Sequence, residues 1–243
     1  MSGVDDLYAQ KFERVSDFVF DEKVAAVFAD MIERSAPGYR ALIAMTTVIA
    51  RQYYVPGTNC YDLGCSLGEL GIAVASTLPS PESLHMIAVD SSPAMLEKCR
   101  HNWALAGLPV KLTLQCRDIT EIPVENASLI LLNYTLQFIE PGRRDALLSR
   151  LVAGMHAGGA LVLSEKVLFE DQSRNETMID LHHAFKRANG YSELEISQKR
   201  TALEKVLRPE TIEAHLARLR AAGFGFTAVW FQCFNFVSFL AVK

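Results

Sequence analysis

From about residue 58 to residue 168, short apolar segments alternate with stretches of helical periodicity. The apolar segments are Asn59 to Leu63, Leu84 to Val89, Val110 to Cys116, Ser128 to Leu132 and Ala160 to Ser164. Apolar strands that alternate with helices are typical of a parallel sheet covered on both faces. The alternation therefore predicts an α/β fold with a doubly wound, mostly parallel sheet.

The residues outside this block follow different patterns. Residues 1–57 are predicted to form a helical cap, in which Asp21 can begin a helix. Residues 169–222 predict a helical insertion. Residues 223–243 hold two aromatic-rich segments that predict a hairpin and bring the sheet to seven strands. Because no linker or repeat separates these parts, we expect one domain over residues 1–243.

Composition narrows the class of protein. Half of the 243 residues are hydrophobic and the net charge is −4, so we expect a large core and no direct nucleic-acid binding. The cysteines show no metal-binding spacing, which predicts reduced thiols in a cytoplasmic protein without a metal. The apolar run Ala41 to Ala50 is about half of a membrane span, so no membrane segment is expected.

The first predicted strand ends in a turn that points to a cofactor. The turn reads Asp-Leu-Gly-Cys-Ser-Leu-Gly from Asp62 to Gly68, with Ser66 where a dinucleotide motif needs its middle glycine. A carboxylate beside the turn repels phosphate and suits a cationic ligand. Asp90 ends the next strand, where a carboxylate can accept hydrogen bonds from a ribose.

This acidic, glycine-containing pattern resembles the motif of class I methyltransferases. Their cofactor, S-adenosylmethionine, carries an ammonium, a sulfonium and a ribose but no phosphate. A dinucleotide site and an ordinary glycine turn are the alternatives. In this fold Asp118 and Ile119, at the end of the third strand, would bind the adenine, and Asn133 would lie near the sulfonium. Asp and Asn are also common turn residues, but four successive polar strand ends favour one shared pocket.

Several longer blocks are more specific than the glycine motif. They are Met31 to Tyr39, Tyr61 to Gly68, Asp90 to Met95, Asn133 to Phe138, Gly159 to Lys166, Phe185 to Arg200 and Trp230 to Phe236. Together they resemble the carboxy-S-adenosylmethionine synthase family. The resemblance implies an enzyme that converts S-adenosylmethionine and prephenate to carboxy-S-adenosylmethionine and phenylpyruvate. The product would pass to a tRNA carboxymethyltransferase that modifies a wobble uridine.

The resemblance also implies residue roles. Arg200 would bind the new carboxylate from the second subunit of a homodimer, a task that suits the planar, permanently charged guanidinium. The other cofactor contacts would come from Tyr39, Gly64, Cys65, Ser66, Asp90, Ser91, Asp118, Ile119 and Asn133. Position 91 is Ser where many members have Asn. His182 and His183 are candidate bases, although in the family the substrate supplies the base.

Other interpretations of the same residues remain open at this point. The basic side chains Lys186, Arg187, Lys199 and Arg200 suit an anionic substrate, but they could also form a solvated helix face. An ordinary methyltransferase of a small molecule or tRNA would use the same cofactor site and leave Arg200 as surface charge. A non-catalytic module that carries the cofactor to a partner is the third hypothesis.

Overall fold

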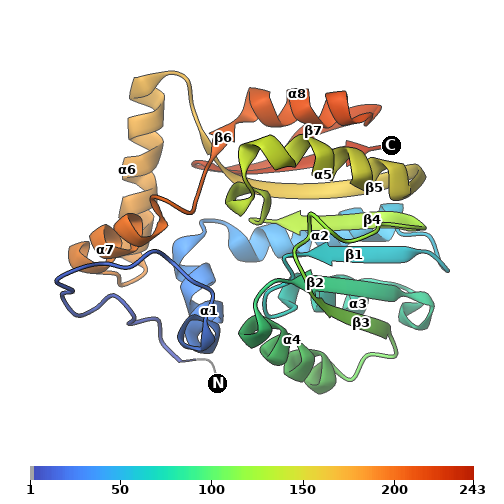
Figure 1. The fold of residues 1–243 in the computed structure, drawn as a ribbon, viewed down its shortest axis with the longest axis horizontal. Helices are drawn as coiled ribbons and strands as arrows, with labels where there is room; N and C mark the ends of the chain where they lie inside the picture. The colour runs from blue at the N-terminus through green and yellow to red at the C-terminus, as the bar shows by residue number, and fades with distance from the viewer. Residues whose placement is uncertain (1–2) are drawn as a thin grey trace.

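The computed structural model describes residues 3–243 as a central sheet between helices (Figure 1). The helices are α1 (Glu22–Ser35), α2 (Tyr39–Tyr53), α3 (Glu69–Thr77), α4 (Pro93–Ala106), α5 (Pro141–Gly154), α6 (Gln172–Ala188), α7 (Glu193–Leu203) and α8 (Ile212–Ala222). The strands are β1 (Asn59–Leu63), β2 (His85–Asp90), β3 (Lys111–Cys116), β4 (Ala127–Asn133), β5 (Met155–Leu168), β6 (Glu210–Thr211), β7 (Phe226–Cys233) and β8 (Phe236–Val242).

The strand order is β3-β2-β1-β4-β5-β8-β7. The first five strands in this order are parallel, while β8 runs antiparallel to both β5 and β7. The predicted seven-stranded, mostly parallel sheet is thus confirmed, and the two-residue β6 adds a short pairing with the end of β5. The order reverses direction between β1 and β4, the place where open α/β sheets bind ligands. Figure 1 shows β1 and β4 pointing toward the group formed by α1, α6 and α7.

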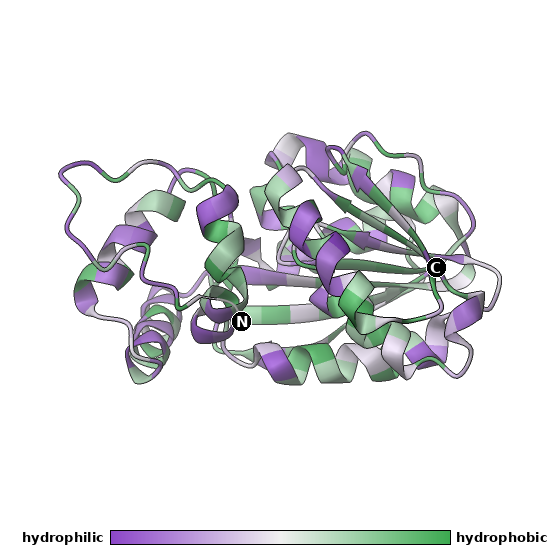
Figure 2. Cartoon of the chain, turned by 90° about the horizontal axis from the view of Figure 1, so that it is seen from below, coloured by the Kyte–Doolittle hydropathy of each residue, from purple (hydrophilic) through white to green (hydrophobic). Residues whose placement is uncertain are grey.

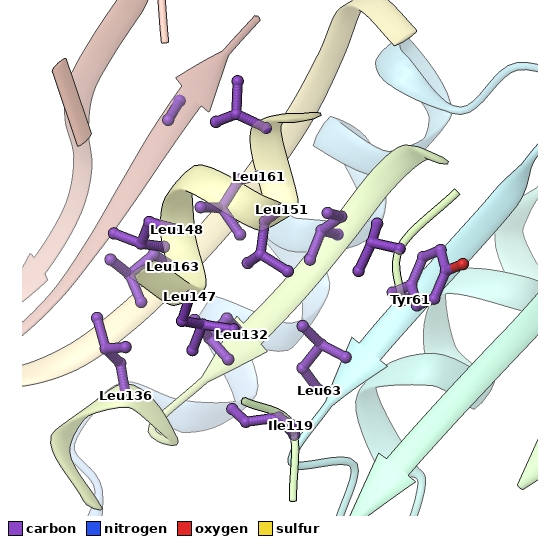
Figure 3. Packing of buried hydrophobic residues seen from close by; sticks show 14 of the residues in the cluster. Tyr61, Leu63, Ile119, Leu132, Leu136, Leu147, Leu148, Leu151, Leu161 and Leu163 are labelled. Carbon is purple, nitrogen blue, oxygen red and sulfur yellow. The ribbon is translucent and has the colours of Figure 1, made fainter. Parts of the chain in front are cut away.

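One face of the sheet is held by leucines of α5. Leu147, Leu148 and Leu151 recur at helical spacing and are fully buried against strand residues such as Leu132 and Leu163 (Figure 3). Burying one such side chain contributes roughly 1.5–3 kcal/mol to the stability of the fold. The packing of α5 on the sheet therefore helps to hold the strand ends in position. Figure 2 shows that hydrophobic residues concentrate on the strands inside the molecule, while hydrophilic residues lie on the outer faces of the helices.

Helix starts follow local sequence signals. The amide of Val24 donates to Asp21 Oδ1 at 2.9 Å, so Asp21 caps α1 as predicted. Ser92 caps α4 in the same way, and Pro93 takes the first helical position. These caps fix the ends of two helices whose first turns border the carboxyl edge of the sheet.

The prediction that residues 1–57 are helical throughout is wrong for the part before α1. Residues 3–20 form turns, bends and irregular chain, while Met1 and Ser2 lie outside the described residues. This segment is held by distant partners: the amide of Phe18 donates to the carbonyl of Ala202 at 3.0 Å. Its conformation is set by packing on α7 and not by local periodicity.

Candidate active site

A cavity of about 610 Å³ opens at the carboxyl edge of the sheet. Its lining includes nine residues predicted to contact the cofactor: Tyr39, Gly64, Cys65, Ser66, Asp90, Ser91, Asp118, Ile119 and Asn133. The sheet brings the strand ends together, and the N-terminus of α2 adds Tyr39. Arg200 is not among the residues that line this cavity.

The glycine turn after β1 is shaped by its neighbours in the chain. Gly64 has a φ of 80°, and a Cβ there would clash with the Thr135 hydroxyl. Gly68 has a φ of 81°, and its Cβ would lie 2.8 Å from Cys99 Sγ. Both positions therefore require glycine before any ligand is considered.

Asp90 ties this turn to the end of β2. Its Oδ2 accepts from the amide of Ser66 at 2.9 Å, and its Oδ1 accepts from the amide of Ser92 at 2.9 Å. Burial raises the pKa of Asp90, although these backbone donors oppose the rise. Each carboxylate oxygen can accept more than one hydrogen bond, so Asp90 retains capacity for the two hydroxyls of a ribose.

Two further carboxylates, not among the predicted contacts, extend this side of the cavity. Asp62 is 3% exposed, and burial together with the charge of Asp90 raises its pKa to about 7. Glu69 accepts from the hydroxyl of Tyr39 at 3.1 Å. We call Asp62, Glu69 and Asp90 the acidic wall. Three carboxylates in one wall suit a ligand with positive charge, which fits an ammonium and a sulfonium better than a pyrophosphate.

Asn133 has an unpartnered atom at the same edge. Its Oδ1 is buried and has no hydrogen-bond donor among the described residues. A buried acceptor without a donor is destabilising by about 1–3 kcal/mol, so the position favours a ligand that donates there. The geometry fits the predicted place of Asn133 beside the cofactor.

Asp118 lies at the far end of the same edge, after β3. Its Oδ1 accepts from the amide of Thr120 at 2.8 Å, and its Oδ2 accepts from Arg143 at 3.2 Å. Burial opposes ionisation, but the hydrogen bonds from Thr120 and the charge of Arg143 outweigh it and lower the pKa of Asp118. Asp118 therefore offers an ionised acceptor suited to an exocyclic amine.

The same cavity is also lined by basic side chains. Lys166 of β5, Lys186 of α6 and Lys199 of α7 all line it, and we call these three residues the basic wall. Lys199 forms an ion pair with Asp5 at 3.2 Å and donates to the Ser35 hydroxyl at 3.0 Å. The sequence singled out Lys186 and Lys199 but not Lys166.

Two arginines of the predicted basic cluster lie elsewhere. Arg187 is exposed and pairs with Glu193 at 3.0 Å, so for this residue the interpretation as a solvated helix face is correct. Arg200 is exposed on α7, although its charge acts on Lys166. Its predicted role at a second subunit stays a prediction.

The two histidines differ in their surroundings. His182 lines the cavity, and its Nε2 lies 2.8 Å from the Ser35 carbonyl. A carbonyl only accepts, so Nε2 carries the proton, and burial plus the charges of Lys186 and Lys166 lower the pKa of His182. His183 is half-buried and does not line the cavity. His182 is therefore neutral, and its position is fixed by the backbone.

Two searches of residues 3–243 bear on other kinds of site. No cluster of three or more His, Cys, Asp or Glu side chains suited to a metal ion occurs in this range. None of the helices in the same range is both long and apolar enough to cross a membrane.

Known proteins resemble this chain at two levels. Residues 61–159 match the methyltransferase domain family. A putative O-methyltransferase from Nostoc punctiforme superimposes with a TM-score of 0.64 at 16% identity, covering 91% of this chain and 59% of that one. Human N-acetylserotonin methyltransferase, solved in complex with S-adenosylmethionine, gives a TM-score of 0.62 at 18% identity, covering 92% and 56%. These neighbours confirm the class I methyltransferase fold.

Closer relatives share nearly the whole chain. The carboxy-S-adenosyl-L-methionine synthase of Trichlorobacter lovleyi is 52% identical over 240 residues, covering 98% of each chain. The Escherichia coli protein of the same name is 49% identical over 243 residues, covering 100% of this chain and 98% of its own. The chain therefore belongs to the carboxy-S-adenosyl-L-methionine synthase family.

Proposed function

We propose that this protein is a carboxy-S-adenosyl-L-methionine synthase, with S-adenosylmethionine and prephenate as its substrates. The observation that carries the proposal is one cavity lined by both an acidic wall and a basic wall, in a chain of this family. The acidic wall suits the ammonium and sulfonium of S-adenosylmethionine. The basic wall suits a substrate with two carboxylates.

The proposed reaction transfers one carboxyl group and balances without a further reactant. Prephenate loses its ring carboxyl as CO2 and its ring hydroxyl as hydroxide, and the ring becomes aromatic in phenylpyruvate. The hydroxide takes a proton from the sulfonium methyl group and becomes water. The carbon left with the electron pair bonds to CO2, which gives the carboxymethyl sulfonium product. No protein base is needed, in keeping with the neutral, backbone-bound His182.

Such a reaction requires that water be excluded, because water would protonate the carbanion before CO2 is captured. The N-terminal segment and α1 supply a lining of aromatic side chains. Phe20 packs edge-on against Phe28 and Phe138, with ring centroids 6.1 and 5.4 Å apart, and all three line the cavity. This aromatic lining supports a reaction through a carbanion, and it is less suited to methyl transfer to a large polar acceptor.

The proposal includes a homodimer in which Arg200 of one subunit binds the product carboxylate in the other. The exposed position of Arg200 on α7, outside the cavity of its own protomer, supports this role. We further propose that the protein works in the cytoplasm and that its product passes to a tRNA carboxymethyltransferase.

The test is to incubate the protein with S-adenosylmethionine and prephenate and to weigh the nucleoside product by mass spectrometry. We expect a gain of one carboxyl group that depends on prephenate, together with phenylpyruvate. Reactions without prephenate and with heat-denatured protein are the controls. Cofactor unchanged by prephenate would overturn the proposal, and methyl transfer to an added acceptor would favour an ordinary methyltransferase.

A further inference from the structure

Among residues 3–243, Lys166 and Lys186 are cavity-lining basic residues that are at least partly buried and have no counter-ion. Lys186 is 7% exposed and lies on α6, and Lys166 is partly buried on β5. Within residues 3–243, neither ammonium group donates a hydrogen bond or forms an ion pair, whereas the neighbouring Lys199 does both. Both line the same cavity as the predicted cofactor-binding residues.

The groups around these lysines make their charge harder to keep. Burial and the charges of Lys199 and Lys166 lower the pKa of Lys186 to about 7, with Asp5 opposing. Burial and the charge of Arg200 lower the pKa of Lys166 to about 8. His182, which lines the same cavity, is neutral and does not balance the charge of either lysine. A buried cation without a partner is destabilising, so the pair is stabilised when an anion enters from outside the chain.

We propose that Lys166 and Lys186 form the subsite that binds the two carboxylates of the second, dianionic substrate. The proposal rests on the proposed function and deepens it. It assigns the substrate carboxylates to two residues for which the resemblance implies no role. The two lysines come from different elements, β5 and α6, so they can contact separate carboxylates of one molecule. Arg200 retains its separate task at the carboxylate of the product.

The test compares Lys166→Gln and Lys186→Gln with the wild type. Each charge-assisted hydrogen bond lost from a buried site lowers affinity by about tenfold to a hundredfold. We therefore expect the KM for prephenate to rise by that factor in each variant, with the Kd for S-adenosylmethionine unchanged. Arg187→Gln is the matched control, because Arg187 is the next residue on α6 but is exposed. An unchanged KM in both lysine variants would overturn the subsite.

A binding measurement separates the subsite from the reaction. Equilibrium dialysis of prephenate in the presence of S-adenosylhomocysteine reports binding without turnover. If the wild type binds prephenate through the lysines but forms no carboxylated product, the subsite stands and the proposed function fails. If product forms and prephenate binding does not depend on the lysines, the subsite fails and the proposed function stands.

A third measurement uses the unaltered protein, in case a variant does not fold. Acetic anhydride modifies accessible lysines, and mass spectrometry locates the acetyl groups. We expect bound prephenate to protect Lys166 and Lys186 but not Lys98, which is exposed on α4. Equal modification of all three lysines with and without prephenate would contradict the proposal.

Discussion

The acidic and basic walls of the cavity are stabilised in different ways. On the acidic side, Asp90 accepts two backbone hydrogen bonds, and Glu69 accepts one from Tyr39. On the basic side, Lys199 has a carboxylate partner, whereas Lys166 and Lys186 have none within residues 3–243. Asp90 and Glu69 are therefore preorganised by the fold, whereas Asp62 Oδ2 is buried without a hydrogen-bond partner among the described residues. The basic wall is complete only when a ligand supplies the missing negative charge.

The largest effect is expected from breaking the preorganised side. Asp90→Ala removes two potential hydrogen bonds to the ribose and leaves the amides of Ser66 and Ser92 without their acceptor. At roughly 1.5–3 kcal/mol for each charged hydrogen bond, affinity should fall by about a hundredfold or more. Calorimetric titration should show equal losses for S-adenosylmethionine and carboxy-S-adenosylmethionine, since both carry the ribose. A loss confined to one ligand would remove Asp90 from this role.

The next effect should distinguish the two ligands. Arg200→Ala should weaken the binding of carboxy-S-adenosylmethionine by about tenfold to a hundredfold, because the charge-assisted contact of the proposed dimer is lost. Binding of S-adenosylmethionine, which lacks the carboxylate, should not change. The same titrations with Arg187→Ala, another exposed arginine, serve as the control. Equal losses for both ligands would contradict the assignment of Arg200.

The pH dependence should have opposite signs on the two walls. Lysine is cationic below its pKa, so kcat/KM for prephenate should fall as pH rises through about 7 and about 8, the pKa values of Lys186 and Lys166. Each group above its pKa should contribute about a tenfold loss per pH unit. Aspartate is anionic above its pKa, so S-adenosylmethionine should bind more tightly as pH rises through about 7, the pKa of Asp62. If kcat/KM for prephenate and the affinity for S-adenosylmethionine changed in the same direction with pH, the proposed difference between the two walls would be contradicted.

The smallest effect should come from Tyr39→Phe. The change removes the hydroxyl that donates to Glu69 at 3.1 Å but leaves the aromatic ring in its buried place. The loss of about 1 kcal/mol corresponds to a fall of about fivefold in affinity for S-adenosylmethionine. The KM for prephenate should stay constant in steady-state assays. A change in this KM larger than the change in affinity for S-adenosylmethionine would indicate that Tyr39 contacts prephenate instead.

The acidic wall and the basic wall also differ in how far they could be predicted. Asp90, Asp118 and Asn133 could be located because alternation of strands and helices places the ends of parallel strands at one edge. Lys166 could not, because the apolar pattern of its strand ends at Ser164. Pairing of β5 with β8 extends the strand to Lys166, and pairing with β6 extends it to Leu168. Lys166 thereby lines the cavity.

Tertiary contacts also explain the wrong prediction for the N-terminal segment. Residues 3–20 lack helical structure because their partners are distant: Gln198 of α7 donates to the carbonyls of Tyr8 and Gln10 at 2.9 and 2.8 Å. Local periodicity carries no information about such partners. The start of α1, where Asp21 acts within three residues, could be predicted for the opposite reason.

The ion pair between Asp5 and Lys199 has a consequence for the number of charges in the cavity. It joins residues 194 positions apart and compensates one of the three positive charges of the basic wall. The basic wall is left divalent, which matches prephenate with its two carboxylates. Phenylpyruvate keeps only one carboxylate, so the match is lost when the reaction is complete. Asp5, near the N-terminus of the described chain, therefore takes part in setting the charge of the basic wall.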